Sequence, residues 1–576
     1  MELTFSEILR FNQEFSKANG QPNYFIKIIS NITVNQLCPV MKYSVISKGI
    51  NADVSVANFD NIAQDSLEFN TSDLVILFWE LCNLLDGFQY KSNTLNSDEL
   101  DQVIQRFKNE IDLVFNNLNN TKLVLVNKFS TQLFNYQLLK TNNFDIVCEE
   151  LNKYLSTKER PNVVLIDIEK IYFNISIEKS INLRDYYSSK SLYTVEFYKK
   201  YAQFILPIIT SILGKSKKAL ILDCDNTLWY GILGEDGEDG IEMSGSTKKG
   251  VYFEEIQYIV KDLVNKGIIV GLNSKNNEAD VDQVLKSHPD FVLKTEDIVI
   301  KKVNWQDKVS NLNEIARDLN IGIDSLVFID DSEFEINLVN KMLPEVLTIK
   351  VPKALHEYPE ALRSNLSQFY NLTETDDDKK RIKSYLLQSI RENEKVQFSN
   401  IQEYLESLDL EITVFENSSK LTSRLAQLTQ KTNQFNLTTK RYLEVEVEDF
   451  INSDKSIAYA INVKDKFGDF GVTGLAFVHL SNQEANIDSL LMSCRVLGRN
   501  IELKFLDEIL NDLKVKGVHT IYATFVPTPK NGQVKDFYGE FGFTLLEEKE
   551  GTKEYMLKLT NYESKNINFI RVHNER

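Results

Sequence analysis

The stretch ALILDCDNT, residues 219–227, joins an apolar strand to a set of polar side chains and decides how the middle of the chain folds. Its first four residues are apolar and run straight into Asp223, and Asp225 and Thr227 follow at every second position. An apolar run of this length that ends in polar residues is typical of a buried strand in a parallel sheet. Open parallel sheets place their ligands at the carboxyl ends of the strands, so both carboxylates can face one pocket there.

Two later apolar runs end in the same way, one at Asn273-Ser274 and the other at Asp330-Asp331. The expected strands span 268–272 and 325–329, and the expected helices span 251–266 and 311–319. Strands that alternate with helices predict an α/β domain, which we place at residues 215–365.

The polar residues at the strand ends suit phosphoryl transfer to an aspartate. Asp223 can act as the nucleophile when a divalent cation neutralises its charge. Asp225 can protonate the leaving oxygen and later deprotonate the attacking water. Ser274 can hold a phosphate oxygen, and Lys308 supplies a fixed positive charge to the same oxygens.

Asp330 and Asp331 add hard oxygen ligands for Mg²⁺. The chain carries four elements in this order: D-x-D-x-T, a Ser, a Lys and paired Asp. They resemble the four motifs of the haloacid dehalogenase (HAD) superfamily. The alternative is that these residues are ordinary helix caps and surface charges. The resemblance implies a Rossmann-like phosphatase domain that needs Mg²⁺ and a small phosphorylated substrate. It gives the nucleophile's role to Asp223 and the general acid/base role to Asp225. The metal ligands it implies are Asp223, Asp225 through its backbone carbonyl, Asp330 and Asp331, and the implied phosphate- or substrate-binding residues are Thr227, Trp229, Asn273, Ser274, Lys275 and Lys308.

A glycine-rich segment, residues 227–245, separates the first motif from the next helix. It is too short for a cap domain, so we expect a capless phosphatase domain with a flap over its site. Trp229 has two interpretations of equal weight: it contacts substrate or excludes water, or it packs beneath the flap.

Residues 1–214 alternate short apolar runs with helix-length polar segments, which predicts an N-terminal α/β domain. The expected strands are 25–29, 43–46, 74–78, 122–126 and 163–166, with a helix at 98–118. The polar residues near the strand ends, such as Ser30 and Asn31, are interpreted as turn or cap residues, and we expect no catalysis here.

A charged segment, residues 366–400, predicts a helical connector to a third domain at 401–565. In that domain MSCRVLGRNIE, residues 492–502, places arginines between a strand and a helix. Such a turn suits a pyrophosphate, because N–H groups at the helix start and arginine side chains face the anion. It resembles the CoA-binding turn of the N-acetyltransferase-like (GNAT) fold, with Asn500 where that turn usually has Gly or Ala. The pantetheine- or CoA-binding residues implied are Asn433, Arg495, Gly498, Arg499 and Tyr538.

Cys494 lies beside Arg495, and cations next to a thiol favour the thiolate. We therefore consider it a candidate catalytic residue that carries an acyl group as a thioester; the alternative is a small buried residue at a strand end. The amides of Asn433, Gln434 and Asn436 either bind a ligand's amides or hold a loop through backbone hydrogen bonds.

Over nearly its whole length the chain resembles the FkbH-like proteins, which join a flavodoxin- or SGNH-like domain, a HAD phosphatase domain of subfamily IIIC and a GNAT-like domain. The segments that carry this resemblance are DNTLWYGILGEDG (225–237), NSKN (273–276), NWQDK (304–308), FIDDSEFE (328–335), KTNQFNLTTKRY (431–442) and MSCRVLGR (492–499). The first domain has no Gly-Asp-Ser block, so no hydrolase activity is expected from it.

The resemblance implies that the chain processes a phosphorylated glyceryl donor, 1,3-bisphosphoglycerate in relatives, and loads the acyl unit onto the thiol of an acyl carrier protein. The acceptor group is then phosphopantetheine on the carrier, or CoA. Two alternatives stay open: a plain phosphatase whose third domain only binds substrate, in surface-polysaccharide or secondary-metabolite synthesis, and a non-catalytic assembly subunit.

A carrier protein is generally acidic, so docking needs a basic patch on this chain; the alternative is that the basic residues form a solvated face. The candidates are Arg424, Lys431, Lys440, Arg441, Arg495, Arg499 and Lys504.

The composition sets the remaining expectations. The chain has 576 residues and a net charge of −18, which argues against nucleic-acid binding, because that needs a basic face. Its five cysteines show no paired spacing, which suits a reduced cytoplasmic protein. No apolar run approaches the roughly 20 residues of a membrane span, so no membrane partner is expected.

Overall fold

The computed structural model describes residues 3–18, 20–135, 139–372, 398, 400–565 and 567–575. The chain forms two compact units, Met1–Thr210 and Ser211–Arg576. The first unit has one sheet, and the second has two, which belong to the middle and third domains of the sequence prediction. The predicted fold class, a multidomain α/β protein, is confirmed. No described helix is long and apolar enough to cross a membrane.

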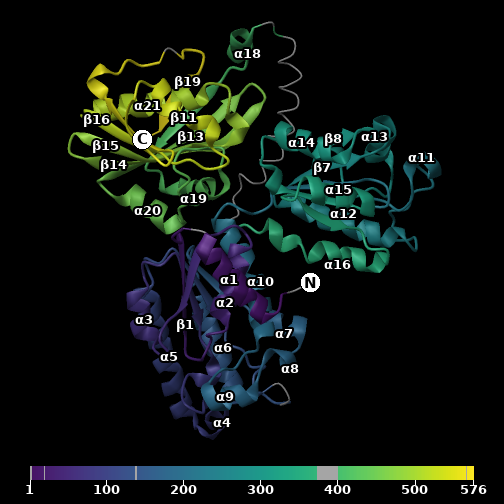
Figure 1. Cartoon of the computed structure of the whole chain (residues 1–576), viewed down its shortest axis with the longest axis vertical. Helices are drawn as coiled ribbons and strands as arrows, with labels where there is room; N and C mark the ends of the chain where they lie inside the picture. The colour runs from purple at the N-terminus through teal and green to yellow at the C-terminus, as the bar shows by residue number, and fades with distance from the viewer. Residues whose placement is uncertain are drawn as a thin grey trace. The chain divides into compact units, whose positions relative to one another are not determined.

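The first unit is built on a parallel sheet in the order β2-β1-β3-β4-β5, with helices on both of its faces (Figure 1). This is the flavodoxin-like strand order. Its strands are β1 (Tyr24–Ser30), β2 (Ala52–Val56), β3 (Leu74–Phe78), β4 (Leu123–Asn127) and β5 (Val163–Ile166). Its helices are α1 (Phe5–Ala18), α2 (Leu37–Ile46), α3 (Ile62–Glu68), α4 (Phe88–Lys91), α5 (Ser97–Asn117), α6 (Asn143–Ser156), α7 (Glu169–Ile175), α8 (Ile177–Ser180), α9 (Leu183–Ser189) and α10 (Val195–Ile212).

One predicted strand of this unit is wrong. Residues 43–46 form the last turn of α2, because Leu37, Val40, Met41, Ser44 and Val45 are buried at helical spacing. The second strand of the sheet lies instead at β2, where inward residues alternate with polar ones at the sheet edge.

Glu80 follows β3 and is buried beneath aromatic side chains, with 1% of its surface exposed. Tyr193 donates a hydrogen bond to its carboxyl over 2.7 Å, and the hydroxyl groups of Tyr193 and Tyr172 lie 2.6 Å apart. Burial raises the pKa of the Glu80 carboxyl to about 8, so this carboxyl is protonated in the folded unit at neutral pH.

This carboxyl predicts a pH-dependent stability that Glu80→Gln removes. Its folded pKa lies above its ordinary value of 4.5, so folded Glu80 holds a proton that the unfolded chain has lost. The free energy of unfolding should therefore fall as pH rises from about 4.5 to about 8, by roughly 1.4 kcal/mol per pH unit. Glutamine keeps an uncharged acceptor for Tyr193, so urea unfolding at pH 6 and pH 8 should show a smaller pH dependence in the variant. Glu68→Gln, at the exposed end of α3, is the control; an unchanged pH dependence in Glu80→Gln contradicts the prediction.

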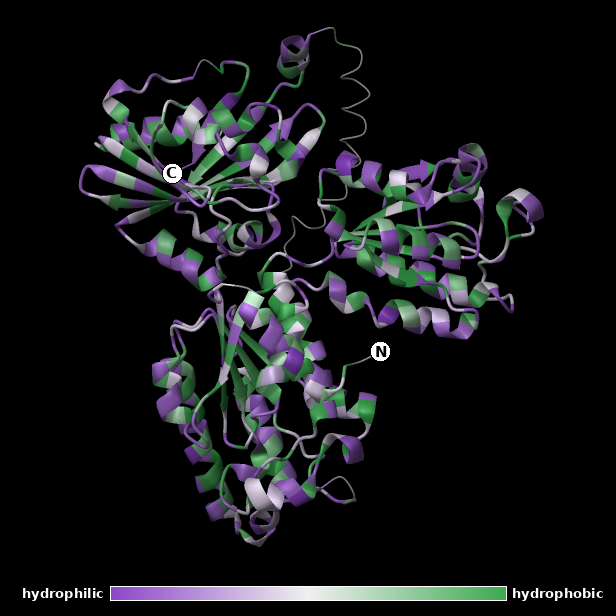
Figure 2. Ribbon diagram, viewed as in Figure 1, coloured by the Kyte–Doolittle hydropathy of each residue, from purple (hydrophilic) through white to green (hydrophobic). Residues whose placement is uncertain are grey.

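The middle domain has a parallel sheet in the order β10-β9-β6-β7-β8. Its strands are β6 (Ala219–Leu222), β7 (Ile269–Ser274), β8 (Ile298–Val303), β9 (Leu326–Asp330) and β10 (Leu347–Lys350). Its helices are α11 (Leu233–Asp236), α12 (Gly250–Asn265), α13 (Glu278–Ser287), α14 (Lys308–Asp318), α15 (Glu333–Met342) and α16 (Tyr358–Arg363). Helix α12 packs with α16, and α14 packs with α15. Figure 2 shows the strands of this sheet mainly in the green of hydrophobic residues, as expected for a buried parallel sheet.

The third domain has a mixed sheet in the order β17-β18-β16-β15-β14-β13-β11-β19, with the short β12 paired to β15. Its strands are β11 (Glu411–Glu416), β12 (Phe435–Asn436), β13 (Ser456–Asp465), β14 (Gly468–Ser481), β15 (Glu484–Met492), β16 (Thr520–Phe525), β17 (Thr544–Lys549), β18 (Thr552–Lys558) and β19 (Arg571–Glu575). Its helices are α18 (Ile401–Ser407), α19 (Thr422–Lys431), α20 (Glu444–Asn452), α21 (Ile501–Val515) and α22 (Phe537–Glu540).

Antiparallel strands β13, β14 and β15 are followed by α21 and then by β16, which is parallel to β15. This is the strand–helix–strand order that the resemblance to the GNAT fold implies. The sheet continues beyond the predicted end of this domain at residue 565, because β19 pairs with β11 and forms an edge strand. Most of the predicted helical connector, at 373–397, lies outside the described residues.

Candidate active site

The candidate site lies at the carboxyl ends of β6, β7 and β9, three neighbouring strands of the middle sheet. Asp223 directly follows β6, and its N–H donates to the carbonyl of Ile329 over 3.0 Å. Ser274 ends β7 and Asp330 ends β9, and both are almost fully buried. The three strand ends bring the sequence motifs together at one sheet edge, as the pattern predicts.

Lys308 ties two of these strand ends together. It begins α14, whose first turn is capped by the Asp307 side chain. Its Nζ lies 3.0 Å from Asp223 Oδ2 and 2.5 Å from Asp330 Oδ2. Burial alone lowers the pKa of Lys308, but the two carboxylates beside it raise that pKa overall, so Lys308 is a fixed cation.

Asp223, Asp330 and Asp331 form a carboxylate cluster in which one oxygen from each residue lies within 4.8 Å of the others. Burial and the charge of Asp223 raise the pKa of Asp330 to about 6, against the lowering effect of Lys308, and burial also raises the pKa of Asp331. Three carboxylates against one ammonium leave negative charge unbalanced in a buried place. Such a set of hard oxygen donors fits a divalent cation such as Mg²⁺.

The Asp225 side chain is held apart from this cluster. It accepts hydrogen bonds from Trp229 Nε1 at 3.0 Å, from the N–H of Leu233 at 3.1 Å and from Asn276 Nδ2 at 2.9 Å. Burial raises the pKa of the Asp225 carboxyl despite these three donors. Its metal contact through the backbone carbonyl stays a prediction.

The flap segment 227–245 folds over the first motif. Trp229 is completely buried and packs edge-on to Phe291, so it lies beneath the flap and orients Asp225. Of its two interpretations, the structure favours packing. The buried hydroxyl of Thr227 has no hydrogen-bond partner among the described residues, so it is available to a ligand.

Two predicted phosphate-binding residues bind other side chains or backbone. Asn273 donates to the carbonyl of Lys308 over 3.0 Å and accepts from Asn311, which fixes the start of α14. Lys275 Nζ pairs with Glu335 at 2.6 Å. These contacts give both residues a role in positioning their neighbours.

Sequence reasoning missed two asparagines that help to shape the site. Asn276 holds Asp225, and Asn226 accepts from the N–H of Gly231 over 3.1 Å from a left-handed backbone conformation, with φ of 50°. The sequence contained a signal for both asparagines, because each lies inside a motif quoted above and asparagine tolerates positive φ. Their roles depend on the path of the flap, which no motif spacing gives.

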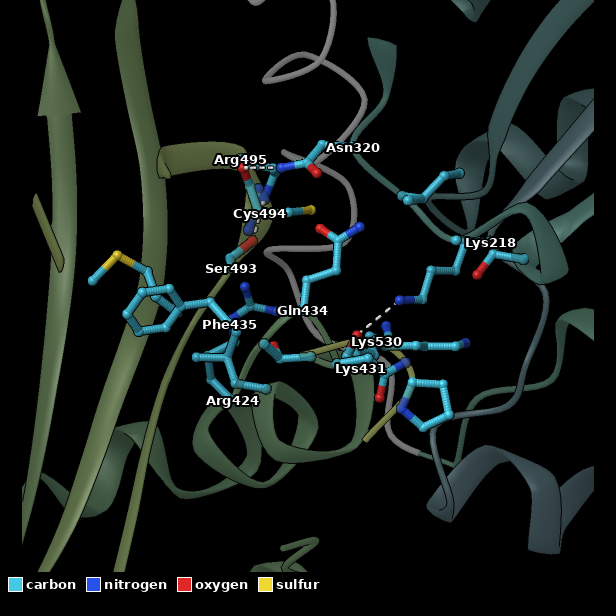
Figure 3. Close-up of a pocket in the computed structure, with 18 residues that line it drawn as sticks. Lys218, Asn320, Arg424, Lys431, Gln434, Phe435, Ser493, Cys494, Arg495 and Lys530 are labelled. Carbon is cyan, nitrogen blue, oxygen red and sulfur yellow. Dashed lines mark hydrogen bonds between the residues drawn. The ribbon is translucent and has the colours of Figure 1, made fainter. Parts of the chain in front are cut away.

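The predicted ligand residues of the third domain do not all meet. Asn433, Cys494 and Arg495 line one cavity, and Cys494 is half-buried there (Figure 3). Arg499 lies over the ring of Phe470 at 4.9 Å and near Asp465 at 3.7 Å, and Tyr538 is buried against Phe543. Gly498, Arg499 and Tyr538 are not among the described residues that line that cavity.

The basic residues proposed for carrier docking are divided in the same way. Arg424, Lys431 and Arg495 line the cavity. Lys440, with a side chain 52% exposed, pairs with Asp488, which fits the alternative of a solvated charged face. Lys504, with a side chain only 14% exposed, pairs with Glu508 at 2.9 Å and fits neither interpretation.

Neither a protein-family model nor a curated protein matches the chain. Among solved structures, the N-terminal part of a Bacteroides fragilis protein, which contains a phosphatase domain and was solved in complex with Mg, is 27% identical with a TM-score of 0.56. The alignment covers 65% of this chain and 100% of that chain. The chain has a phosphatase-type architecture.

Two acetyltransferase structures match with low scores. The Escherichia coli ribosomal-protein-S18-alanine N-acetyltransferase is 10% identical with a TM-score of 0.21, and the alignment covers 27% of this chain and 97% of that one. The Thermoplasma acidophilum PaiA N-acetyltransferase, in complex with coenzyme A, is 15% identical with a TM-score of 0.18, over 20% of this chain and 70% of that one. The fold of the third domain is defined by its own sheet and helices.

Proposed function

We propose that this chain is a Mg²⁺-dependent phosphatase that uses an aspartate nucleophile and serves acyl transfer to a carrier-protein thiol. The observation that carries the phosphatase part is the cluster at the sheet edge: Lys308 joined to Asp223 and Asp330, with Asp331 beside them. A buried, charge-unbalanced set at the carboxyl ends of parallel strands is the arrangement that phosphoryl transfer needs. The magnesium-bound phosphatase structure described above supports the same reading.

In this mechanism Asp223, Asp330 and Asp331 hold the cation, which supplies neutralising charge to the phosphoryl oxygens. An oxygen of Asp223 attacks phosphorus, and the bond to the leaving oxygen breaks. Asp225 gives its proton to that oxygen, and its raised pKa suits it to carry one. Water then attacks the aspartyl-phosphate, its proton passes to Asp225, and inorganic phosphate leaves Asp223 free. Lys308 stabilises the charge on the phosphoryl oxygens throughout.

The acyl-transfer part is the finer proposal. The donor is a phosphorylated glyceryl-type acid, as the sequence resemblance implies, and Cys494 and the cavity beside it belong to the acyl step. The plain-phosphatase alternative keeps the middle site and leaves the third domain only substrate binding. The assembly-subunit alternative is disfavoured, because a buried cluster of unbalanced charge is unfavourable for stability and a purely structural protein does not need one.

Intact mass spectrometry of a holo carrier protein tests this function. The carrier is incubated with the full chain, Mg²⁺ and freshly generated 1,3-bisphosphoglycerate, and we expect a mass increase of one glyceryl unit. Asp223→Asn should abolish that product; a phosphoglyceryl adduct with this variant alone places acyl transfer before dephosphorylation. Asp223-dependent phosphate release without any adduct contradicts loading of this donor onto this carrier and leaves the plain phosphatase.

A further inference from the structure

The gap between β15 and β16 is filled by the chain itself. These parallel strands pair only over Glu484–Ile487 and Thr520–Ala523. Farther along β15, the short strand β12 takes the vacant edge, with Phe435 opposite Met492 and Asn436 opposite Leu491.

The next residue of this inserted segment links the two diverging strands. The N–H of Leu437 donates to the carbonyl of Leu490 over 3.1 Å, and the Leu437 carbonyl accepts from the N–H of Val526 over 2.8 Å. The segment Phe435–Leu437, which we call the wedge segment, is therefore hydrogen-bonded on both of its sides.

Side chains fix the wedge segment in place. Asn531 is fully buried, and its Nδ2 donates to the carbonyls of Asn436 at 3.0 Å and Val526 at 2.8 Å. The ring of Phe435 packs edge-on to Phe537 at 5.0 Å. The wedge segment is thus an integral part of the sheet, and a ligand could take its place only by breaking these contacts.

CoA binding needs a free strand edge and a free helix start, and residues of this chain occupy both places in the third domain. The pantetheine arm of CoA carries amides that pair with a free strand edge, in the manner of β-augmentation, and its pyrophosphate needs N–H groups at a helix start. The edge of β15 is covered by the wedge segment. At the start of α21, Glu502 places its carboxyl in the first helical turn, where its Oε2 is buried and has no hydrogen-bond partner among the described residues. A carboxyl group of the chain therefore lies where the pyrophosphate would bind, and the predicted CoA residues do not fit CoA.

A separate cavity of about 280 Å³ adjoins the wedge segment (Figure 3). Lys218 and Asn320 of the middle domain reach its wall, where Lys218 Nζ donates to the carbonyl of Lys431 over 2.8 Å and Asn320 to that of Cys494 over 3.3 Å. The cavity is at the small end for ligand sites, which suits a metabolite rather than a dinucleotide-sized cofactor.

The lining of this cavity is cationic. Five basic side chains contribute to it, and the described residues that line it include no acidic side chain. The basic residues are Lys218, Arg424, Lys431, Arg495 and Lys530, and Lys530 pairs with Asp324 at 2.5 Å. The buried Oε1 of Gln434 has no hydrogen-bond partner among the described residues, and Figure 3 shows this side chain extending between Cys494 and Lys218. A hydroxyl donor on a ligand satisfies this amide oxygen, and the basic lining favours an anionic group on the same ligand.

We propose that the third domain excludes CoA, because its own wedge segment and Glu502 occupy the CoA positions, and that its ligand site is the cationic cavity beside Cys494, which takes a small phosphorylated hydroxy acid. The inference rests on the proposed function only for the choice of ligand class. Its evidence, the filled β15 edge and the cavity, is independent of the phosphatase cluster.

Protection of Cys494 from alkylation tests this inference. The full chain with Asp223→Asn, in EDTA, is treated with iodoacetamide, and peptide mass spectrometry follows Cys494 and the half-buried Cys38 of the first unit. We expect millimolar 3-phosphoglycerate to slow alkylation of Cys494 at least about fivefold and to leave Cys38 unchanged. The same concentration of CoA should change neither rate, and inorganic phosphate should protect less than 3-phosphoglycerate, because it cannot reach the amide and the cations together.

Two cavity variants and one control locate the effect. Lys431→Gln and Lys530→Gln should each weaken the protection several-fold, and Lys535→Gln, with a side chain 64% exposed outside the cavity, should not. Protection of Cys494 by CoA overturns the exclusion of CoA. No protection by 3-phosphoglycerate, or equal protection in both cavity variants, overturns the assignment of the cavity. Phosphate release at Asp223 is unaffected by either result, so failure here is distinct from failure of the proposed function.

Discussion

Asp223→Asn is expected to lower Mg²⁺-dependent phosphate release by at least about 10³-fold, because the amide cannot form the aspartyl-phosphate. The substitution is nearly isosteric and keeps an oxygen near Lys308, so the fold should persist. Release of inorganic phosphate from a phosphorylated acid, measured with and without Mg²⁺, gives the result directly.

Asp297→Asn is the matched control for this prediction. Asp297 is also a buried aspartate of the middle domain, and it pairs with Lys261 at 2.6 Å, away from the cluster. Its substitution should cost stability and leave the rate of phosphate release within about twofold. If both variants lose activity equally, the loss comes from removing a buried carboxylate–lysine pair. That outcome contradicts the role of Asp223 as the nucleophile.

Lys308→Met is expected to lower the free energy of unfolding of the middle domain by about 3–5 kcal/mol in EDTA. The loss arises because Asp223 and Asp330 stay buried without the ammonium that neutralises them. Millimolar Mg²⁺ should restore part of it, because a divalent cation on the cluster supplies positive charge to the same oxygens. Urea unfolding followed by tryptophan fluorescence suits this measurement, since Trp229 is buried in this domain.

Lys261→Met shows what a lysine–aspartate pair contributes away from the cluster. The Lys261 side chain is 29% exposed, so solvent screens the pair and the expected loss is about 1 kcal/mol, with no response to Mg²⁺. If Mg²⁺ fails to stabilise Lys308→Met beyond this control, the carboxylate cluster does not hold the metal.

Most of the middle site could be predicted because three of its groups stand at strand ends. A buried parallel sheet leaves few places for polar residues, so Asp223, Ser274 and Asp330 had to converge at one edge. The contacts of Asn273 and Lys275 could not be predicted in this way. They depend on how α14 and α15 pack, and their charge and amide chemistry suit a phosphate as well as a neighbouring side chain.

The third domain shows where sequence patterns stop being informative. A two-residue strand such as β12 has no periodicity of its own and exists because β15 offers an unpaired edge. The arginine-rich turn predicted an anion site, yet Arg499 lies near Asp465 and Glu502 adds a carboxyl to the first turn of the helix. The short apolar run at 43–46 failed for a related reason, since four residues fit a strand and a helix end equally well.

The length of β6 has a consequence for the acyl transfer that we propose. Lys218, in the wall of the cationic cavity, directly precedes this strand, and Asp223 directly follows it. Five residues of extended chain separate them by about 16 Å, at roughly 3.3 Å per residue. A compact three-carbon acid is shorter than this span, so one bound beside Lys218 does not reach Asp223. In the function that we propose, acyl transfer and phosphate removal are then two separate binding events, linked by free diffusion or by a long flexible tether such as the prosthetic arm of a carrier.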